Sequence, residues 1–186
     1  MDALLTFDDE AGNRFEIYAD EDAKSPREDD NLGTIYSNHR DYNPDKHLIT
    51  ELNPLLINKR KLDRDYIWLK IWAYIHGGVS ITAGERTYPY NDTFDSGLFG
   101  IIAVKRDKVR KEYDVKRINP SLKKKVLDVL AAEVDTLNMY YNDDVYGFKM
   151  FNPQGEEIDS CWGFYADDLD KLKEELLAEY GEKKED

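Results

Sequence analysis

The clearest pattern of hydrophobic and polar positions lies near the C-terminus, where two runs rich in aromatic and aliphatic residues flank a polar turn. The first run is Val145–Phe151, the second is 158–165, and the segment 152–155, Asn-Pro-Gln-Gly, separates them. Asparagine, proline and glycine are typical of tight turns. The pattern therefore predicts a β-hairpin. Aromatic residues on both faces of the second run predict a strand inside a sheet rather than at its edge.

Strict alternation along this second strand assigns its side chains to two faces. Trp162 and Phe164 would share one face, and Cys161 would lie on the other. Gly147 and Gly163 stand in mid-strand, where glycine often marks a bulge or a close backbone approach. We interpret the aromatic residues as core packing, with a ligand pocket lined by Trp162 as the alternative.

Shorter patterns predict the other elements. Two apolar runs around the turn at 9–13 predict an N-terminal hairpin. Further strands are expected at 31–38, 79–82 and 96–104, and the nearly continuous apolar run Tyr66–Ile75 suits either a buried helix or a buried strand. Segment 47–62 has helical spacing that Pro54 interrupts, so two short helical turns or one broken helix are both open.

Three helices have start signals in the sequence. Asp107 is placed to cap a helix over 108–114. Asn119 followed by Pro120 predicts a helix to about Tyr141, with an apolar stripe at spacings of three and four. A last helix is expected to begin at Asp167 and Asp168 and to end near Gly181. Together these elements predict an α+β fold, in which two or three helices pack on a central, mostly antiparallel sheet that includes the aromatic hairpin.

Length and composition are consistent with one soluble domain. The chain has 186 residues, of which 41% are hydrophobic, and contains one cysteine and no apolar run long enough to cross a membrane. The N-terminus lacks the features of a secretory signal, and a single cysteine fits a reducing cytoplasm. We therefore expect a single cytoplasmic domain over 1–186, in which 182–186 form a frayed tail.

The net charge of −13 is unevenly distributed along the chain. Residues 1–50 and 142–186 have net charges of −8 and −9, while the middle is mildly basic. Such a protein is repelled by nucleic acid and by anionic lipid, and is attracted to basic surfaces that normally hold nucleic acid. The carboxylates predicted to bind such a partner are Asp20, Glu21, Asp22, Glu28, Asp29, Asp30, Asp167, Asp168, Glu174 and Glu175.

No motif in the sequence predicts a catalytic site, a metal or a cofactor. The phosphate-binding glycine motifs are absent, and His39 and His47 lack the spacing of a helical metal pair. Phe94 stands where a nucleophile elbow requires glycine. A small modifying or hydrolytic enzyme that uses His76, Asp95 and Ser96 remains an alternative hypothesis.

Basic residues concentrate between 105 and 125. This run is interpreted as the solvated face of helices or as the partner of the acidic ends in a homodimer, and an anionic ligand is the other option. A second functional hypothesis follows from it: a protein that sequesters a nucleotide signal, with Trp162 or Tyr88 stacking on the base.

Three stretches, 30–42, 95–118 and 144–167, resemble a widespread family of small acidic proteins encoded by phages and conjugative elements of gut Firmicutes. Members of that family usually have Trp before Asp-Ser-Gly, where this chain has Phe94. The resemblance implies a mobile-element context and offers no catalytic residues. It suggests an anti-CRISPR or anti-restriction protein that binds a host Cas effector or restriction complex through an acidic surface that mimics nucleic acid.

Overall fold

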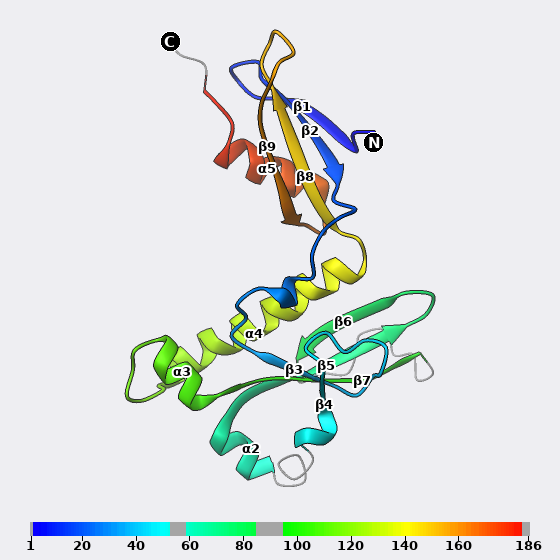
Figure 1. The fold of residues 1–186 in the computed structure, drawn as a ribbon. Helices are drawn as coiled ribbons and strands as arrows, with labels where there is room; N and C mark the ends of the chain where they lie inside the picture. The colour runs from blue at the N-terminus through cyan, green and yellow to red at the C-terminus, as the bar shows by residue number, and fades with distance from the viewer. Residues whose placement is uncertain (1, 53–58, 85–94, 184–186) are drawn as a thin grey trace. The chain divides into compact units, whose positions relative to one another are not determined.

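The computed structural model describes residues 2–52, 59–84 and 95–183, and the chain divides into two compact units (Figure 1). Unit 1 consists of Met1–Lys24 and Met139–Asp186, and unit 2 consists of Ser25–Asn138. The α+β class is confirmed, with 33% helix and 35% strand. The strands form two sheets, one in each unit, instead of one central sheet. That all 186 residues form one domain stays a prediction.

Unit 1 is a four-stranded antiparallel sheet with one helix. Its elements are β1 (Leu5–Asp8), β2 (Arg14–Ala19), β8 (Val145–Phe151), β9 (Glu157–Tyr165) and α5 (Leu169–Glu179). The strand order is β1-β2-β8-β9. Both predicted hairpins are confirmed, and β2 joins them by pairing with β8, with Phe15 opposite Met150 and Ile17 opposite Phe148.

The core of unit 1 lies on one face of this sheet, between the strands and α5. Phe15, Ile17 and Phe148 are fully buried there, against Leu172 and Leu176 of the helix. The Phe15 ring lies 5.6 Å from that of Phe148, within the range of favourable aromatic pairs. One helix thus covers one sheet face, which explains the alternation of apolar and polar residues along β1 and β2.

The prediction that the second aromatic strand lies inside a sheet was wrong, because β9 is the edge strand. The predicted faces were also wrong at one position. Gly163 has a φ of 89°, and the β8–β9 register shifts at this point. The bulge turns Phe164 to the same core as Cys161, while Trp162 stays 43% exposed.

Gly147 has a packing role in unit 1. A Cβ added there would lie 2.1 Å from the Trp162 ring, so the indole lies directly over the glycine backbone. Tyr18 flanks the same ring at 6.3 Å. An exposed tryptophan therefore gains its packing from a neighbouring strand that lacks a side chain at this point.

Unit 2 is built on a five-stranded sheet of order β4-β3-β7-β5-β6, in which only the β3–β4 pair is parallel. Its strands are β3 (Thr34–Ser37), β4 (His47–Leu48), β5 (Tyr66–Ile75), β6 (Val79–Gly84) and β7 (Ser96–Lys105). Its helices are α2 (Lys59–Asp65), α3 (Arg106–Glu112) and α4 (Pro120–Tyr141), with 3₁₀ turns η1 (Pro26–Glu28) and η2 (Ile49–Leu52). The last three residues of α4 belong to unit 1. The run 66–75 is thus a strand, and residues 53–58 of the ambiguous segment 47–62 lie outside the described residues.

Both faces of the unit 2 sheet are covered (Figure 1). Leu130 of α4 lies on one face, near Ile102 and Gly33, where an added Cβ would meet both side chains within 2.8 Å. Leu52 of η2 and Leu62 of α2 pack on the other face, against Ile101 and Ala103. Burial on both faces explains why β7 is apolar without alternation and buried from residue 99 to 104.

The predicted helix boundaries are partly confirmed. Asn119 caps α4 as expected, by accepting a hydrogen bond from the Leu122 amide at 2.8 Å. Asp107 does not cap α3, because Lys105 occupies the N-cap position and Asp107 lies in the first turn. The frayed tail over 182–186 stays a prediction: the Glu182 amide donates to Asp9 Oδ2 at 2.9 Å, and residues 184–186 lie outside the described part of the chain.

Candidate functional site

The two units differ sharply in charge. Unit 1 has 22 acidic and 7 basic residues, a net charge of −15 in 72 residues. Unit 2 has 17 acidic and 19 basic residues, a net charge of +2 in 114 residues. The acidity noted at both ends of the sequence therefore belongs mainly to one folded unit, which the N- and C-terminal segments build together.

The structure separates the ten carboxylates that the sequence singled out. Asp20, Glu21 and Asp22 lie in unit 1, with Asp167, Asp168, Glu174 and Glu175, whereas Glu28, Asp29 and Asp30 lie in unit 2. All are exposed except Asp20, which is half-buried. The continuous acidic loop of the sequence is thus divided between two units at residue 25.

One end of the unit 1 sheet brings several of these carboxylates together. The Asp20 amide, just after β2, donates to the Val145 carbonyl at the start of β8 at 2.8 Å. Val145 is in turn opposite Tyr165 at the end of β9. Because β2 and β9 end where β8 begins, the carboxylates next to these strand ends gather here. We call this group the acidic end; its members are Asp20, Glu21, Asp22, Asp143, Asp144, Asp167 and Asp168.

The pKa of Asp144 is raised by burial and by neighbouring carboxylates. Partial burial raises the pKa of its carboxyl, and the charges of Asp167 and Asp143 raise it further. The hydroxyl of Tyr146, which donates to Asp144 at 3.4 Å, acts in the opposite direction. The like charges of Asp167 and Asp143 thus add to the effect of burial on this carboxyl.

A hollow of about 530 Å³ opens beside the acidic end. Asp20, Glu21 and Asp143 line it together with the rings of Tyr140 and Tyr141. Carboxylates next to aromatic rings form an environment that suits a guanidinium or ammonium group, which binds both by charge and by contact with ring faces. Asp143 and Asp144 were missed in the sequence because their proximity to Asp20 and Asp167 depends on strand pairing.

The remaining predicted carboxylates of unit 1 are on or near α5. Asp168 caps the helix by accepting from the amides of Asp170 and Lys171, so its charge also has a structural role. Asp167 forms an exposed ion pair with Lys171 at 3.3 Å. Glu174 and Glu175 are exposed on the helix.

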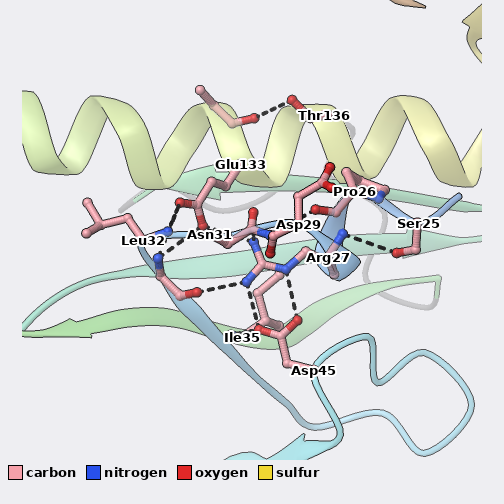
Figure 2. A network of polar contacts seen from close by, with 12 residues as sticks. Ser25, Pro26, Arg27, Asp29, Asn31, Leu32, Ile35, Asp45, Glu133 and Thr136 are labelled. Atoms are coloured by element: carbon pink, nitrogen blue, oxygen red, sulfur yellow. Dashed lines mark hydrogen bonds and ion pairs between the residues drawn. The ribbon is translucent and has the colours of Figure 1, made fainter. Parts of the chain in front are cut away.

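A buried arginine fixes the loop that holds Glu28, Asp29 and Asp30 (Figure 2). The Arg27 side chain is only 3% exposed and forms ion pairs with Asp45 at 2.7 Å and with Glu133 of α4 at 2.9 Å. Its three nitrogens donate five hydrogen bonds; the acceptors are Asp45 Oδ1, Asp45 Oδ2, Glu133 Oε2, Asn31 Oδ1 and the Gly33 carbonyl. An arginine has five N–H donors, so every one is satisfied.

The two carboxylates of this network also bind the backbone. Glu133 accepts from the amide of Leu32 at 2.7 Å, and Asp45 accepts from the amide of Ile35 at 2.7 Å. Burial would lower the pKa of Arg27, but the hydrogen bonds and charges of Asp45 and Glu133 outweigh it and raise that pKa. We interpret the network as structural, because it consumes its own hydrogen-bonding capacity and leaves none for a ligand.

The structure brings together two of the three residues in the alternative enzyme hypothesis. His76 Nδ1 lies 2.9 Å from Asp95 Oδ2, because Tyr74 pairs with Ser96 and so places the β5–β6 turn next to the start of β7. The His76 side chain is 72% exposed. An ion pair this open to water is typical of a protein surface and contributes about 0–1 kcal/mol.

Among the described residues, no group of three or more His, Cys, Asp or Glu side chains is arranged to hold a metal ion. Nor does the described part of the chain contain a helix of the length and apolar character needed to cross a membrane. Comparison of the chain with protein-family models, with curated proteins and with solved structures found no match.

Proposed function

We propose that this protein is a phage or mobile-element counter-defence protein. It inhibits a host nucleic-acid-targeting immune effector, a CRISPR-Cas nuclease or a restriction complex, by binding through an acidic, nucleic-acid-mimicking surface, and it catalyses no reaction. The observation that supports this proposal is the concentration of a net charge of −15 in unit 1. Within unit 1, we assign the contact to the acidic end.

The physical argument begins with the partner. A groove that holds nucleic acid is lined by lysine and arginine, and duplex DNA presents about one negative charge per 1.7 Å of its axis. The seven clustered carboxylates of the acidic end are a fixed anionic surface of the kind such a groove attracts. The hollow lined by Tyr140 and Tyr141 gives one basic side chain of the effector a place to insert.

The test uses two triple variants with the same change in charge and the same residue types. The first variant is Asp20→Asn, Glu21→Gln and Asp22→Asn, at the acidic end. The matched control is Glu28→Gln, Asp29→Asn and Asp30→Asn, in unit 2. Each variant neutralises one glutamate and two aspartates, and five of the six residues are exposed.

The measurement is inhibition of DNA cleavage by a panel of purified Cas nucleases and restriction complexes at two salt concentrations. We expect the wild-type protein to inhibit one of them, more weakly at high salt, because exposed charges are screened. The first variant should raise the half-inhibitory concentration by about tenfold or more, since charge complementarity governs encounter. If neither salt nor the first variant changes the half-inhibitory concentration, the acidic end is not the contact. If the protein inhibits no member of the panel, the proposed function is wrong.

A further inference from the structure

Unit 2 contains a cationic cleft that the acidic function does not use. Its volume is about 480 Å³, a size typical of small-molecule sites. It lies around the N-terminal part of β5, and α2, α3 and α4 also contribute lining residues. Those residues are Lys59, Asp63, Tyr66, Ile67, Trp68, Leu69, Lys70, Arg106, Lys123 and Leu127.

The charge of this cleft is opposite to that of the whole chain. Four of the lining residues are cations and one is an acid, although the protein has 39 acidic and 26 basic residues. Within the described ranges, none of the four cations forms an ion pair with a carboxylate. The single acid, Asp63, already accepts a hydrogen bond from the indole of Trp68 at 2.9 Å. The cleft therefore retains uncompensated positive charge for an anion.

Arg106 is held in an orientation that leaves most of its donors available. Its Nε donates to the backbone carbonyl of Asp63 at 3.2 Å, which ties α3 to the end of α2. Among the described residues, its two Nη groups have no protein partner. A guanidinium with free Nη groups suits bidentate contact with phosphate oxygens. Lys123, from the first turns of α4, lines the same cleft and adds a second cation.

Trp68 supplies an aromatic wall. Its Nε1 is fixed by Asp63, and Lys59 Nζ lies 6.0 Å from the centre of its ring. Trp68 also packs against the apolar cluster on the α2 face of the sheet, and this packing restrains the position of its side chain. An anchored indole in a cationic cleft suits stacking of a nucleic-acid base.

We propose that this cleft binds a free nucleotide, with its phosphate on Arg106 and Lys123 and its base against Trp68. The site differs from the one expected for a nucleotide-signal protein, which relied on Trp162 or Tyr88. Trp162 lies on the unit 1 sheet, and Tyr88 is outside the described residues. Of the basic run 105–125, only Arg106 and Lys123 are among the residues described as lining the cleft.

Fluorescence of Trp68 tests the proposal directly. The chain has three tryptophans, so the variant Trp72→Phe with Trp162→Phe leaves Trp68 as the single indole. Trp72→Phe removes a buried N–H without a hydrogen-bond partner among the described residues, and Trp162→Phe keeps an aromatic ring over Gly147. The titrants are ATP, GTP, cyclic di-AMP, cyclic di-GMP, inorganic phosphate and a ten-nucleotide single strand.

We expect at least one nucleotide to change the fluorescence of Trp68 with a Kd below about 100 μM, and phosphate to bind more weakly because it cannot stack. Calorimetry of the wild-type protein should give the same affinity. No signal from any nucleotide at millimolar concentration, by either method, overturns the proposal. Binding of the single strand more than tenfold tighter than any nucleotide overturns the assignment of a free nucleotide as the ligand.

Charge reversal locates the site. Lys123→Glu should weaken nucleotide binding at least tenfold, because it places a carboxylate beside the phosphate position. The matched control is Lys116→Glu, which makes the same change at an exposed position that does not line the cleft. Equal affinities of the two variants would place the ligand elsewhere and overturn the proposal. Lys123→Glu should still inhibit the immune effector like the wild type, so the two proposals fail or succeed separately.

Discussion

Unit 1 and unit 2 cover their sheets in different ways, and they also differ in charge. Each unit pairs an antiparallel sheet with helices, but α5 covers one face of the unit 1 sheet, whereas α4 and the η2–α2 segment cover both faces in unit 2. A sheet that is buried on one face has alternating polar positions that can accept charged residues. Unit 1 fills its surface mainly with carboxylates, while unit 2 balances 17 acids with 19 bases.

The comparison also shows two different uses of an acidic group. At the acidic end of unit 1, partial burial raises the pKa of Asp144, and the like charges of Asp167 and Asp143 raise it further. In unit 2, Asp45 and Glu133 share the single buried guanidinium of Arg27. Asp45 and Glu133 therefore stabilise the loop that they hold, whereas burial next to like charges makes ionisation of Asp144 unfavourable.

The largest expected effect comes from removing the cation of the unit 2 network. Arg27→Ala leaves two carboxylates with little exposure and no ion-pair partner in this network, so we expect a loss of about 3–5 kcal/mol in the free energy of unfolding. Urea unfolding measures this loss of stability. The control is Arg40→Ala, which removes an arginine at an exposed position. Hydrogen exchange should show lost protection in both units if the prediction of one domain is right. Loss confined to unit 2 would refute that prediction, and a change below 1 kcal/mol would refute the structural role of Arg27.

A smaller loss of stability is expected at Gly147, where the Trp162 ring packs on a backbone that carries no side chain. Gly147→Ala places a Cβ against the Trp162 ring, so we expect a loss of about 1–3 kcal/mol from overpacking. In a protein that already carries Trp162→Ala, Gly147→Ala should destabilise less. Urea unfolding of the single and double variants, combined in a double-mutant cycle, measures this difference. Gly97→Ala is the control, because an added Cβ there meets no atom of the described residues within 4 Å. Equal costs for Gly147→Ala with and without Trp162 would show that the ring does not depend on this glycine.

Salt should act differently on the two units. A net charge of −15 makes unit 1 repel itself, and added salt screens that repulsion. Raising NaCl from 20 to 300 mM, read by hydrogen exchange, should increase protection in unit 1 more than in unit 2. The free energy of opening in unit 1 should rise by about 0.2–1 kcal/mol more than that in unit 2, which is the contribution of one exposed ion pair. An equal change in both units would mean that the uneven charge has no energetic consequence.

The smallest effect concerns the titration of Asp144. Its pKa is higher in the folded protein than in the unfolded chain, so ionisation of this carboxyl costs stability as pH rises through the folded pKa. Asp144→Asn should therefore raise the melting temperature at pH 7, and the gain should disappear in acid, below both pKa values. Thermal unfolding between pH 3 and 7 measures it, with the exposed Asp30→Asn as the control. A gain that is independent of pH would exclude the titration as its cause.

Local sequence signals predicted the elements that depend on local interactions. Asn119 and Pro120 marked the start of α4, and the spacing of Val126, Leu130 and Val134 marked its buried stripe. The α+β class and both hairpins followed from the same kind of signal. Strict alternation failed at Phe164, because a bulge at Gly163 changes the face of every later residue in the strand. The apolar run Tyr66–Ile75 was ambiguous, because burial on both faces removes periodicity.

The sequence alone determined α4, α5, the hairpins, the absence of a recognised catalytic motif and the total charge, because each depends on neighbouring residues or on simple counting. Only the tertiary structure decided that Asp143 and Asp144 join Asp20 at one end of a sheet, and that Arg106, Lys123 and Trp68 line the same cleft. The physical reason is that these groups meet through strand pairing and helix packing between residues far apart in the chain. Neither spacing nor composition specifies those pairings before the two cores have formed.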